Sequence, residues 1–312
     1  MTHPRVSVCM VTFEQEDYVD QALRSALTQD LEDIEVVVGD DASSDRTLEI
    51  VREWARRDPR VRILPDEGVI GPRANYMRTL AECRGRYISQ LDGDDYWTNP
   101  GKLRVQADLL DAQADCALCF TASQEVDQSG APLGEVLRPP NRRPRYTLEN
   151  FAVVNLANSC AMMWRRGVFG PIPGWFKDAP VGDWPMHMLH AEHGDIAYID
   201  QNMAAHRSHA RGIWAGRDLL ARVRVNLGCH ACFLTHLQPS TVARIRPAIL
   251  QYQLQLAQLY EAKGEFGAAR EILSWLRVHA RGDAAVPARR LWMDSARVAV
   301  KAVLGRGARA SS

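Results

Sequence analysis

The stretch Tyr87-Ile-Ser-Gln-Leu-Asp-Gly-Asp-Asp95 places three carboxylates around a single glycine, directly after an apolar run. The apolar run indicates a β-strand, and the carboxyl ends of parallel strands form the ligand-binding edge of an α/β sheet. Clustered carboxylates repel one another, and a hard divalent cation with oxygen ligands would keep them charged. The alternative is a polar turn in which Asp92 or Asp95 caps the next helix. This stretch alone leaves both interpretations open.

Strand and helix patterns alternate over the first hundred residues. Four short apolar runs predict strands, and the segments between them have apolar side chains at helical spacing. The predicted strands are residues 6–11, 34–38, 61–64 and 87–91, and the predicted helices are residues 18–29, 46–57 and 71–83. This β-α-β order predicts an α/β fold with a Rossmann-like, mostly parallel sheet that has helices on both faces.

The pattern changes in the second half of the chain. A helix at 102–113, strands at 116–126, 159–165 and 196–199, and a helix at about 185–193 are followed beyond residue 217 by helical patterns alone. We therefore predict an α/β domain over residues 1–217 and an α-helical C-terminal extension over 218–312. Residues 254–275 have the pattern of one TPR-like helix-turn-helix unit, which must pack on its neighbours to bury its apolar face.

The composition restricts the kind of partner and compartment. Thirty-eight basic residues balance 38 acidic ones, so the net charge gives no support for nucleic-acid binding. No apolar run has the length of a membrane span, no signal peptide is recognised, and seven cysteines suggest reduced thiols, so we expect a cytoplasmic protein. The pairs Cys116/Cys119 and Cys229/Cys232 have metal-like spacing, but the first falls on a predicted strand, where positions three apart face opposite ways. The sequence therefore does not favour a shared zinc site.

Polar residues follow three of the predicted parallel strands, where they would meet at one edge of the sheet. These residues are Thr12 and Glu14, Asp40 and Asp41, and Asp92, Gly93 and Asp94. No glycine-rich dinucleotide fingerprint and no lysine-bearing phosphate loop is present, so a bound phosphate would need a metal ion and arginine. Asp40 suits the imide N–H of a pyrimidine base. Its alternative role is a turn or helix cap together with Ser43 and Ser44.

Three segments together resemble glycosyltransferases of family 2, which have the GT-A fold. The segments are residues 6–14, residues 37–45, and Asn75 followed by residues 85–95, and the resemblance covers about residues 5–215. It implies an inverting enzyme that moves a hexose-type sugar from a nucleotide sugar, with UDP as the expected nucleotide, to a hydroxyl of a glycan or lipid-linked glycan. It also implies Mn²⁺ or Mg²⁺ as cofactor, a nucleotide half at about 1–100 and an acceptor half at about 101–217.

The resemblance assigns roles to residues of the nucleotide half. Asp40 or Asp41 would meet the base, Asp92 with Gly93 the ribose side, and Asp94 the metal, while Thr12 lies where the family contacts the nucleotide. Glu14 occupies a position where the family usually has asparagine, which puts its local hydrogen bonds in doubt. His209 corresponds to a histidine that reaches the metal or diphosphate. Arg73 could reach the uracil or a phosphate, or be a surface arginine near a helix start.

The acceptor side rests on fewer signals. Asp183 precedes a predicted helix, where it could act as an N-cap; the resemblance instead makes it the base that deprotonates the acceptor hydroxyl. Trp184 offers an aromatic face for a sugar, although large aromatic side chains are more often core. Asn158 and Ser159 lie where the family lines its acceptor pocket.

The end of the chain is basic, and it leaves two further questions open. The last 32 residues carry seven Lys or Arg and two Asp, so a terminal amphipathic helix could make peripheral contact with an anionic membrane or could simply pack on the domain. The alternative to an enzyme is a scaffolding protein that uses the helical tail, with a degenerate nucleotide-sugar domain. A nucleotidyltransferase would be expected to carry an early basic, glycine-rich loop, which is absent from the sequence.

Overall fold

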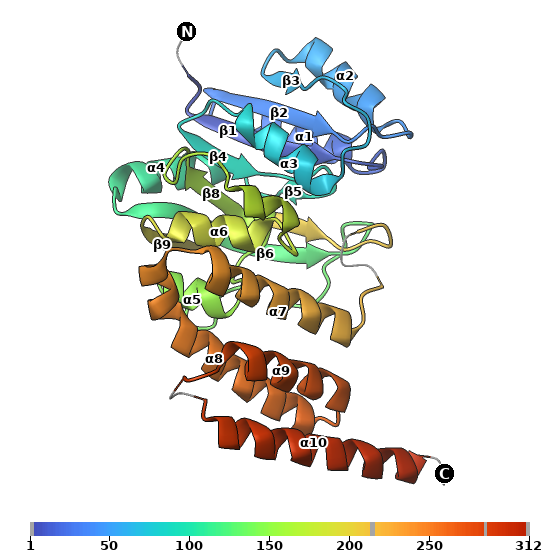
Figure 1. Cartoon of the computed structure of the whole chain (residues 1–312). Coiled ribbons are helices and arrows are strands. Elements are labelled where there is room, and N and C mark those ends of the chain that lie inside the picture. The colour runs from blue at the N-terminus through green and yellow to red at the C-terminus, as the bar shows by residue number, and fades with distance from the viewer. Residues whose placement is uncertain (1–2, 213–215, 284–285, 310–312) are drawn as a thin grey trace. The chain divides into compact units, whose positions relative to one another are not determined.

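The structure is a computed structural model that describes residues 3–212, 216–283 and 286–309, and it divides into two compact units (Figure 1). The first unit runs through Leu148 and adds Asn155–Lys177 and the segment that begins at Leu189. The second unit contains Glu149–Val154, Asp178–Met188 and the chain from Gly216 onward. The second unit thus includes two short segments that lie within the predicted 1–217 domain.

The first unit is built on a single sheet, and the predicted α/β class is confirmed. Its strands have the spatial order β3-β2-β1-β4-β8-β6-β9-β5, with β7 paired to β9. The neighbours β3, β2, β1 and β4 are parallel, as are β6 and β9, whereas β8 is antiparallel to both β4 and β6. The strands are β1 Val6–Thr12, β2 Ile34–Asp40, β3 Val61–Ile63, β4 Tyr87–Gln90, β5 Tyr96–Trp97, β6 Cys116–Val126, β7 Arg145–Tyr146, β8 Met162–Arg165 and β9 Asp195–Arg207.

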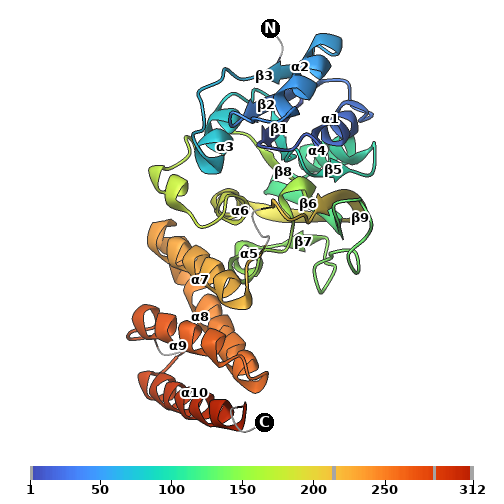
Figure 2. The ribbon, with the colours of Figure 1, turned by 90° about the vertical axis from the view of Figure 1, so that its right-hand side faces the viewer.

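Helices cover both faces of this sheet, as the alternating pattern predicted. Figure 2 shows α1 and α4 on one side of the strands and α3 on the other. The helices are α1 Val19–Leu27, α2 Thr47–Arg57, α3 Pro72–Ala81 and α4 Lys102–Ala112. Val19, Leu23 and Ala26 share one face of α1 and are fully buried, so the core forms where this helical stripe meets the strands.

Two predicted strands in the second half have different bounds. β8 begins at Met162 because residues Ser159–Ala161 form a 3₁₀ turn, whereas we predicted a strand from residue 159. β9 runs over Asp195–Arg207 instead of 196–199. The polar residues after Ile199 suggested an end, but the ladder between β6 and β9 continues past them through register shifts near Ala122. Because of this extension, β9 ends at Arg207, whose amide donates to Asp95 of the acidic turn.

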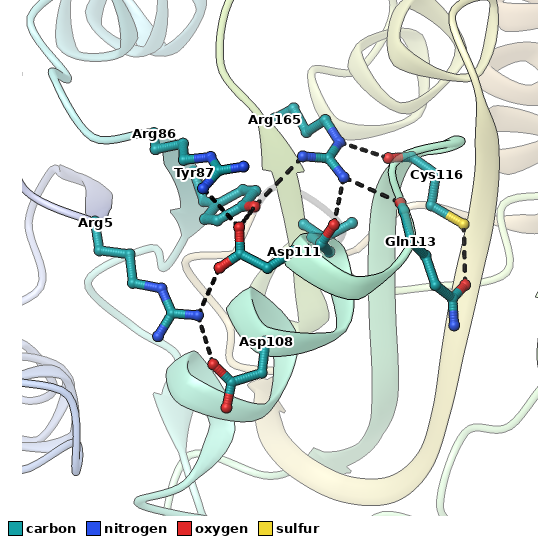
Figure 3. A network of polar contacts seen from close by, with 9 residues as sticks. Arg5, Arg86, Tyr87, Asp108, Asp111, Gln113, Cys116 and Arg165 are labelled. Carbon is teal, nitrogen blue, oxygen red and sulfur yellow. Dashed lines mark hydrogen bonds and ion pairs between the residues drawn. The ribbon is translucent and has the colours of Figure 1, made fainter.

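A network of charged side chains fastens the amino edge of the sheet to α4 (Figure 3). Asp111 accepts hydrogen bonds from Arg5 Nη2 at 2.8 Å and from the Tyr87 hydroxyl at 2.6 Å, and pairs with Arg86 Nη1 at 2.7 Å. Asp108 also pairs with Arg5. Arg165 of β8 donates to the carbonyl oxygens of Leu110, Gln113 and Cys116. Asp108 and Asp111 therefore each have a cationic partner.

The second unit is helical around its own core. Its helices include α5 Leu148–Val153, most of α6 Asp183–Ala191, α7 Leu219–His236, α8 Pro239–Ala262, α9 Phe266–His279 and α10 Ala288–Arg309. The chain turns between α8 and α9 at Gly264, whose φ of 78° suits glycine. Leu254 of α8 and Ile272 of α9 lie in one core cluster with residues of α7 and α10. The predicted helix-turn-helix unit thus buries its apolar face against neighbouring helices.

The basic terminal helix is tied to this unit by ion pairs. Arg297 and Lys301 of α10 contact the Glu261 carboxylate of α8 at 2.7 and 2.9 Å. Within the described residues, no helix is long and apolar enough to cross a membrane. Peripheral membrane contact through α10 stays a prediction.

Candidate functional site

The predicted polar residues of the first two strands meet at the carboxyl edge of the sheet. Thr12 and Asp40 are partners in the parallel ladder of β1 and β2, and the Thr12 hydroxyl donates to Asp40 Oδ2 at 2.7 Å. The Asp41 amide donates to the Thr12 carbonyl at 3.0 Å. The ladder register therefore fixes the positions of Thr12, Asp40 and Asp41 relative to one another.

Asp40 and Asp41 each organise a loop. Asp40 accepts from the Ser43 amide at 2.8 Å on Oδ1 and from the Ser43 hydroxyl at 2.7 Å on Oδ2, so the turn considered in the sequence analysis is present. Asp41 accepts from the Ile70 amide at 2.8 Å and from the Gly71 amide at 3.0 Å, which holds the chain that enters α3. Together with the Thr12 hydroxyl, these donors use three of the roughly four acceptor positions of the Asp40 carboxylate, and all three donors are neutral.

Arg73 lies in the first turn of α3, close to this loop. Its guanidinium carbon is 5.4 Å from the centre of the Phe176 ring, which is a cation–π distance. Phe176 is fully buried in the first unit. The contact holds Arg73 near the carboxyl edge of the sheet; its contact with a base or phosphate stays a prediction.

Two further residues of α3 support the same edge, and we did not predict their roles. Asn75 donates to the Gly39 carbonyl at 2.7 Å, and Arg78 donates to the Asp40 carbonyl at 2.7 Å and to Asn75 Oδ1 at 3.0 Å. A side chain at Gly39 would collide with Thr79 Oγ1, which lies 1.9 Å from the Cβ position. The available signal was the polar pair Asn75 and Arg78, three apart on one helix face.

Glu14, where the resemblance led us to expect asparagine, makes its own set of hydrogen bonds. It has a φ of 53°, a left-handed conformation that asparagine adopts more readily than glutamate. Its Oε1 accepts from the Ser44 amide and the Ser44 hydroxyl, each at 2.8 Å, and its amide donates to the Ser43 hydroxyl at 3.0 Å. Glu14 therefore joins the β1 and β2 loops.

The acidic turn continues the pairing of β4 with β1. The Gly93 amide donates to the Val11 carbonyl at 3.0 Å, and the Asp95 amide donates to the Asp92 carbonyl at 3.1 Å. A Cβ at Gly93 would lie 2.5 Å from Gln15 Oε1 and 2.7 Å from Thr12 Cγ2, so only glycine fits here without a shift. The turn leads into β5, not into a helix, and Asp95 Oδ1 accepts from the Arg207 amide at 2.8 Å. A helix-cap role for Asp95 is therefore wrong; Asp95 fastens the turn to β9.

Two carboxyl groups of this turn have raised pKa values, which means that their charged forms are destabilised. Burial, followed by the charges of Asp94 and Asp95, raises the pKa of Asp92 to about 7. Burial likewise raises the pKa of Asp95 to about 6, against the opposing charge of His206. The Gln90 amide donates to Asp92 at 3.1 Å, which compensates only in part. A bound cation would remove this cost, because it would stabilise the charged form of each acid.

Asp94 faces His209, the histidine chosen from the sequence. Asp94 Oδ2 lies 3.0 Å from His209 Nε2, and the side chains are 20% and 4% exposed. The His209 ring packs on Tyr18 with ring centres 4.9 Å apart, and its Nδ1 is buried without a hydrogen-bond partner in the described part of the chain. One carboxylate oxygen and one imidazole nitrogen thus lie within hydrogen-bond distance of each other.

These two groups fit Mn²⁺ or Mg²⁺ as a partial ligand set. In residues 3–212, 216–283 and 286–309 no cluster of three or more His, Cys, Asp or Glu side chains is arranged to hold a metal. Hard divalent ions are commonly held by one or two protein side chains, with phosphate oxygens and water as the other ligands. Asp94 and His209 could therefore supply two of the ligands of such an ion, and phosphate oxygens and water would have to supply the others.

Arg207 holds the acidic turn in place, and sequence reasoning missed it. Its Nε donates to the Asp94 carbonyl at 2.9 Å, and its Nη2 donates to Gln21 Oε1 at 2.6 Å. The guanidinium lies 4.7 Å from the centre of the Tyr18 ring. Arg207 is nearly fully buried despite its charge. Its position between the two histidines of His206-Arg-Ser-His209 was visible, but the contacts depend on the unexpected length of β9.

The predicted acceptor residues divide between the two units. Ser159 and Asn158 lie in the first unit, where the Ser159 hydroxyl approaches Asp92 Oδ2 at 3.5 Å and the Asn158 amide donates to Ser123 Oγ at 3.2 Å. Asp183 is the first residue of α6 and belongs to the second unit. The role of each in acceptor binding or catalysis stays a prediction.

Trp184 lies in the core of the second unit. It is 5% exposed, and its indole N–H donates to the Phe151 carbonyl at 2.7 Å. The rings of His230 and Phe233 pack against it with centres 5.2 Å away. This packing accounts for Trp184 as the core aromatic that we named as the alternative; sugar stacking by Trp184 stays untested.

Comparison with known proteins is consistent across sequence and structure. The sequence profile described as "Glycosyl transferase family 2" matches residues 7–169. An uncharacterized protein of Mycobacterium tuberculosis is 34% identical over 212 residues, which cover 67% of this chain and 60% of the relative. The chain thus spans about 60% of the length of that curated relative.

Solved structures share the fold at low identity. Residues 1–349 of TarS from S. aureus, in complex with UDP-GlcNAc, superpose with a TM-score of 0.66 at 17% identity, covering 96% of this chain and 89% of TarS 1–349. The mannosyltransferase PcManGT from Pyrobaculum calidifontis, in complex with GDP-Man and Mn²⁺, gives a TM-score of 0.64 at 18% identity, covering 97% of this chain and 87% of that chain. Both likenesses extend over the sheet and the helical region, and both concern the fold.

Proposed function

Because this chain belongs to glycosyltransferase family 2, we propose that it moves a hexose-type sugar from a UDP-sugar to a hydroxyl of a glycan or lipid-linked glycan. The observation that carries the proposal is the 3.0 Å contact between Asp94 and His209, beside the half-buried acid Asp92 with its raised pKa. A strongly raised carboxyl pKa next to a carboxylate–imidazole pair is typical of a ligand site. The structures of TarS with UDP-GlcNAc and PcManGT with GDP-Man support a nucleotide-sugar donor.

Asp40 is proposed to recognise the base. Its Oδ2 accepts from Thr12 and Ser43 hydroxyls, while Oδ1 accepts from the Ser43 amide alone. One acceptor position therefore remains on Oδ1, which suits the single imide N–H of uracil. Arg73 and Thr12 would contribute at the same edge, and Asp92 with Gly93 at the ribose.

Asp94 and His209 are proposed to hold Mn²⁺ or Mg²⁺ together with the diphosphate. When bound, such an ion supplies positive charge that stabilises the departing nucleoside diphosphate. The protein's own contribution is to hold one carboxylate oxygen and one imidazole nitrogen 3.0 Å apart. Arg207 keeps the Asp94 backbone there through its 2.9 Å hydrogen bond.

Asp183 is proposed as the catalytic base. A direct displacement at the anomeric carbon needs a carboxylate that takes the proton of the attacking acceptor hydroxyl. The new glycosidic bond forms on the face opposite the departing diphosphate, so the configuration inverts. Asn158 and Ser159 are proposed to line the acceptor side.

The donor assignment is tested with a panel of UDP-, GDP-, dTDP- and CMP-sugars, measured by melting temperature and by release of nucleotide with Mn²⁺ or with EDTA. We expect a UDP-sugar to raise the melting temperature and to be slowly hydrolysed only with the metal ion. If another nucleotide is preferred, the assignment of Asp40 to uracil is wrong. If no nucleotide sugar binds or turns over with any divalent ion, the enzyme proposal fails and the scaffolding alternative gains.

The base assignment needs a separate pair of variants. Asp183→Asn should lower transfer to an acceptor by about 100-fold or more while UDP-sugar binding is retained, because general base catalysis contributes on that scale. Asp178→Asn is the matched control, since Asp178 is an exposed acid in the same unit. Equal transfer by Asp183→Asn and the wild type would remove Asp183 from the mechanism.

A further inference from the structure

The second unit contains a cleft that none of the proposed catalytic residues lines. It has a volume of about 380 Å³ and lies between α7 and α9. Its walls include Arg224, Ala231, Glu271, Trp275, Val278 and His279. The volume is in the range of small-molecule sites and is large enough for one or two sugar rings.

One wall of the cleft is aromatic. Trp275 and His279, one turn apart on α9, stack with ring centres 4.1 Å apart and planes inclined by 14°. His279 Nδ1 donates to the Trp275 carbonyl oxygen at 2.9 Å, because a carbonyl oxygen can only accept. The Trp275 indole N–H is buried and has no hydrogen-bond partner among the residues that the structure describes. Buried indole N–H groups usually have one.

Two oppositely charged side chains of the cleft pair with each other. Arg224 Nε contacts Glu271 Oε1 at 2.9 Å, and the two side chains are 61% and 36% exposed. The pair leaves no excess charge among the lining side chains, while it presents both donors and acceptors. Small residues of α7, among them Ala231, face the aromatic wall. Val278, which is 61% exposed, adds an apolar surface at the rim.

We propose that this cleft binds a neutral glycan, as a sugar-binding site separate from the catalytic one. Pyranose rings combine an apolar face with hydroxyls that both donate and accept, which matches an aromatic wall opposite a neutral ion pair. An anionic ligand would meet Glu271 as well as Arg224, and a purely apolar ligand would displace water from this exposed ion pair without offering it hydrogen bonds. That the bound glycan is the acceptor of the sugar transfer rests on the proposed function. That the cleft binds a neutral glycan does not depend on it.

The experiment measures glycan binding by the full chain without nucleotide or metal. Chitotetraose, cellotetraose and mannotetraose are titrated by calorimetry into the wild type, Trp275→Ala and Ala231→Leu. We expect at least one tetrasaccharide to bind, and both variants to weaken its affinity by about tenfold or more, since about 1.4 kcal/mol of lost contact gives that factor. Trp292→Ala is the matched control, because Trp292 is 68% exposed on α10 and lies outside the cleft.

Folding and catalysis are followed in parallel. Ala231→Leu places a larger side chain in the open cleft and deletes no side-chain atoms from the core. It therefore keeps the test valid if Trp275→Ala fails to fold. Donor hydrolysis with Mn²⁺ should be the same in all four proteins, which separates this site from the catalytic one. No binding of any of the three probes to the wild type at 10 mM (about the weakest affinity that carries meaning for a site of this size) would overturn the proposal. Equal affinity in Ala231→Leu and the wild type would also overturn it.

Discussion

Aspartate side chains at the two edges of the sheet have pKa values shifted in opposite directions. At the amino edge, the Tyr87 hydrogen bond and the neighbouring Arg5 and Arg86 hold the pKa of Asp111 below its usual value. At the carboxyl edge, burial and neighbouring acids raise the pKa of Asp92 to about 7. Paired acids stabilise the folded chain, whereas acids that crowd one another store a cost that a ligand can relieve. The difference separates carboxylates that hold the fold from those that serve the site.

The largest test of this comparison is one amide substitution at each edge. Asp94→Asn should lower metal-dependent donor turnover by about 100-fold or more, since a metal ion stabilises several kcal/mol of transition-state charge. Asp111→Asn, measured per folded molecule, should turn over donor at the wild-type rate. Without metal, the melting temperature of Asp94→Asn should change little, because the variant loses one of three repelling charges but also weakens the 3.0 Å contact with His209. Equal activity of the two variants would show that the edges do not divide the work in this way.

The second test concerns stability. Asp111→Asn should lower the free energy of unfolding by about 1–2 kcal/mol, because Arg5, Arg86 and Tyr87 lose a charged acceptor at a site that is partly open to solvent. Glu53→Gln is the control, since Glu53 forms an exposed i,i+4 pair with Arg57 and should change stability by less than about 0.5 kcal/mol. Urea denaturation of both variants provides the measurement. If both variants lose the same amount, the amino-edge network is no stronger than an ordinary surface ion pair.

The third test uses pH, and it compares the metal-free wild type with Asp92→Asn. Well below the ordinary carboxyl pKa of 3.8, Asp92 is protonated in both the folded and the unfolded state and its shift contributes nothing to stability. As pH rises toward 7, the unfolded chain releases this proton and the folded chain keeps it, so the wild type loses stability relative to the variant. The loss is complete above the folded pKa of about 7. Because water screens part of Asp92, we expect a change of about 1 kcal/mol between pH 5 and pH 8.

The difference between two proteins is needed because other groups titrate in the same range. Burial lowers the pKa of His187 and of His230 to about 4, and these groups add stability as pH rises from 4 to 6.5 in both proteins alike. For Asp111→Asn the gap to the wild type should stay constant from pH 5 to pH 8. Its lowered pKa means that the stabilisation is lost only in acid. A constant gap for Asp92→Asn as well would mean that the carboxyl edge is not strained.

The acidic ends of β1, β2 and β4 could be predicted from sequence because each follows its strand directly. A strand's end fixes the position of the next two or three residues, and parallel pairing then brings Thr12, Asp40 and Asp92 to one edge. His209 could not be predicted in this way and was identified only through the family resemblance. Its contact with Asp94 depends on β9 reaching Arg207, whose register shifts are set by tertiary pairing.

Supporting residues were harder to predict. Arg78 and Arg207 act through backbone carbonyls, which leave no mark in the sequence, so their side chains resemble any surface arginine until the fold is known. The position of β8 between β4 and β6 was equally hidden, because strand order depends on crossovers and not on the pattern within a strand. For Trp184 the sequence left sugar stacking and core packing both open, and only the fold shows that the side chain is buried.

The smallest effect should come from Glu14, a third kind of acid at the carboxyl edge, bonded to neutral donors. Glu14→Asn loses or shortens the reach to Ser44 but gains a residue better suited to the φ of 53°, so we expect unfolding free energy within about 0.5 kcal/mol of the wild type. Glu14→Ala loses the hydrogen bonds and keeps the strained φ, so it should be about 1 kcal/mol less stable. If Glu14→Asn is as destabilised as Glu14→Ala, the link to Ser44 outweighs backbone conformation. In that case Glu14 belongs with Asp111 among the acids that hold the fold, although it lies at the edge of the site.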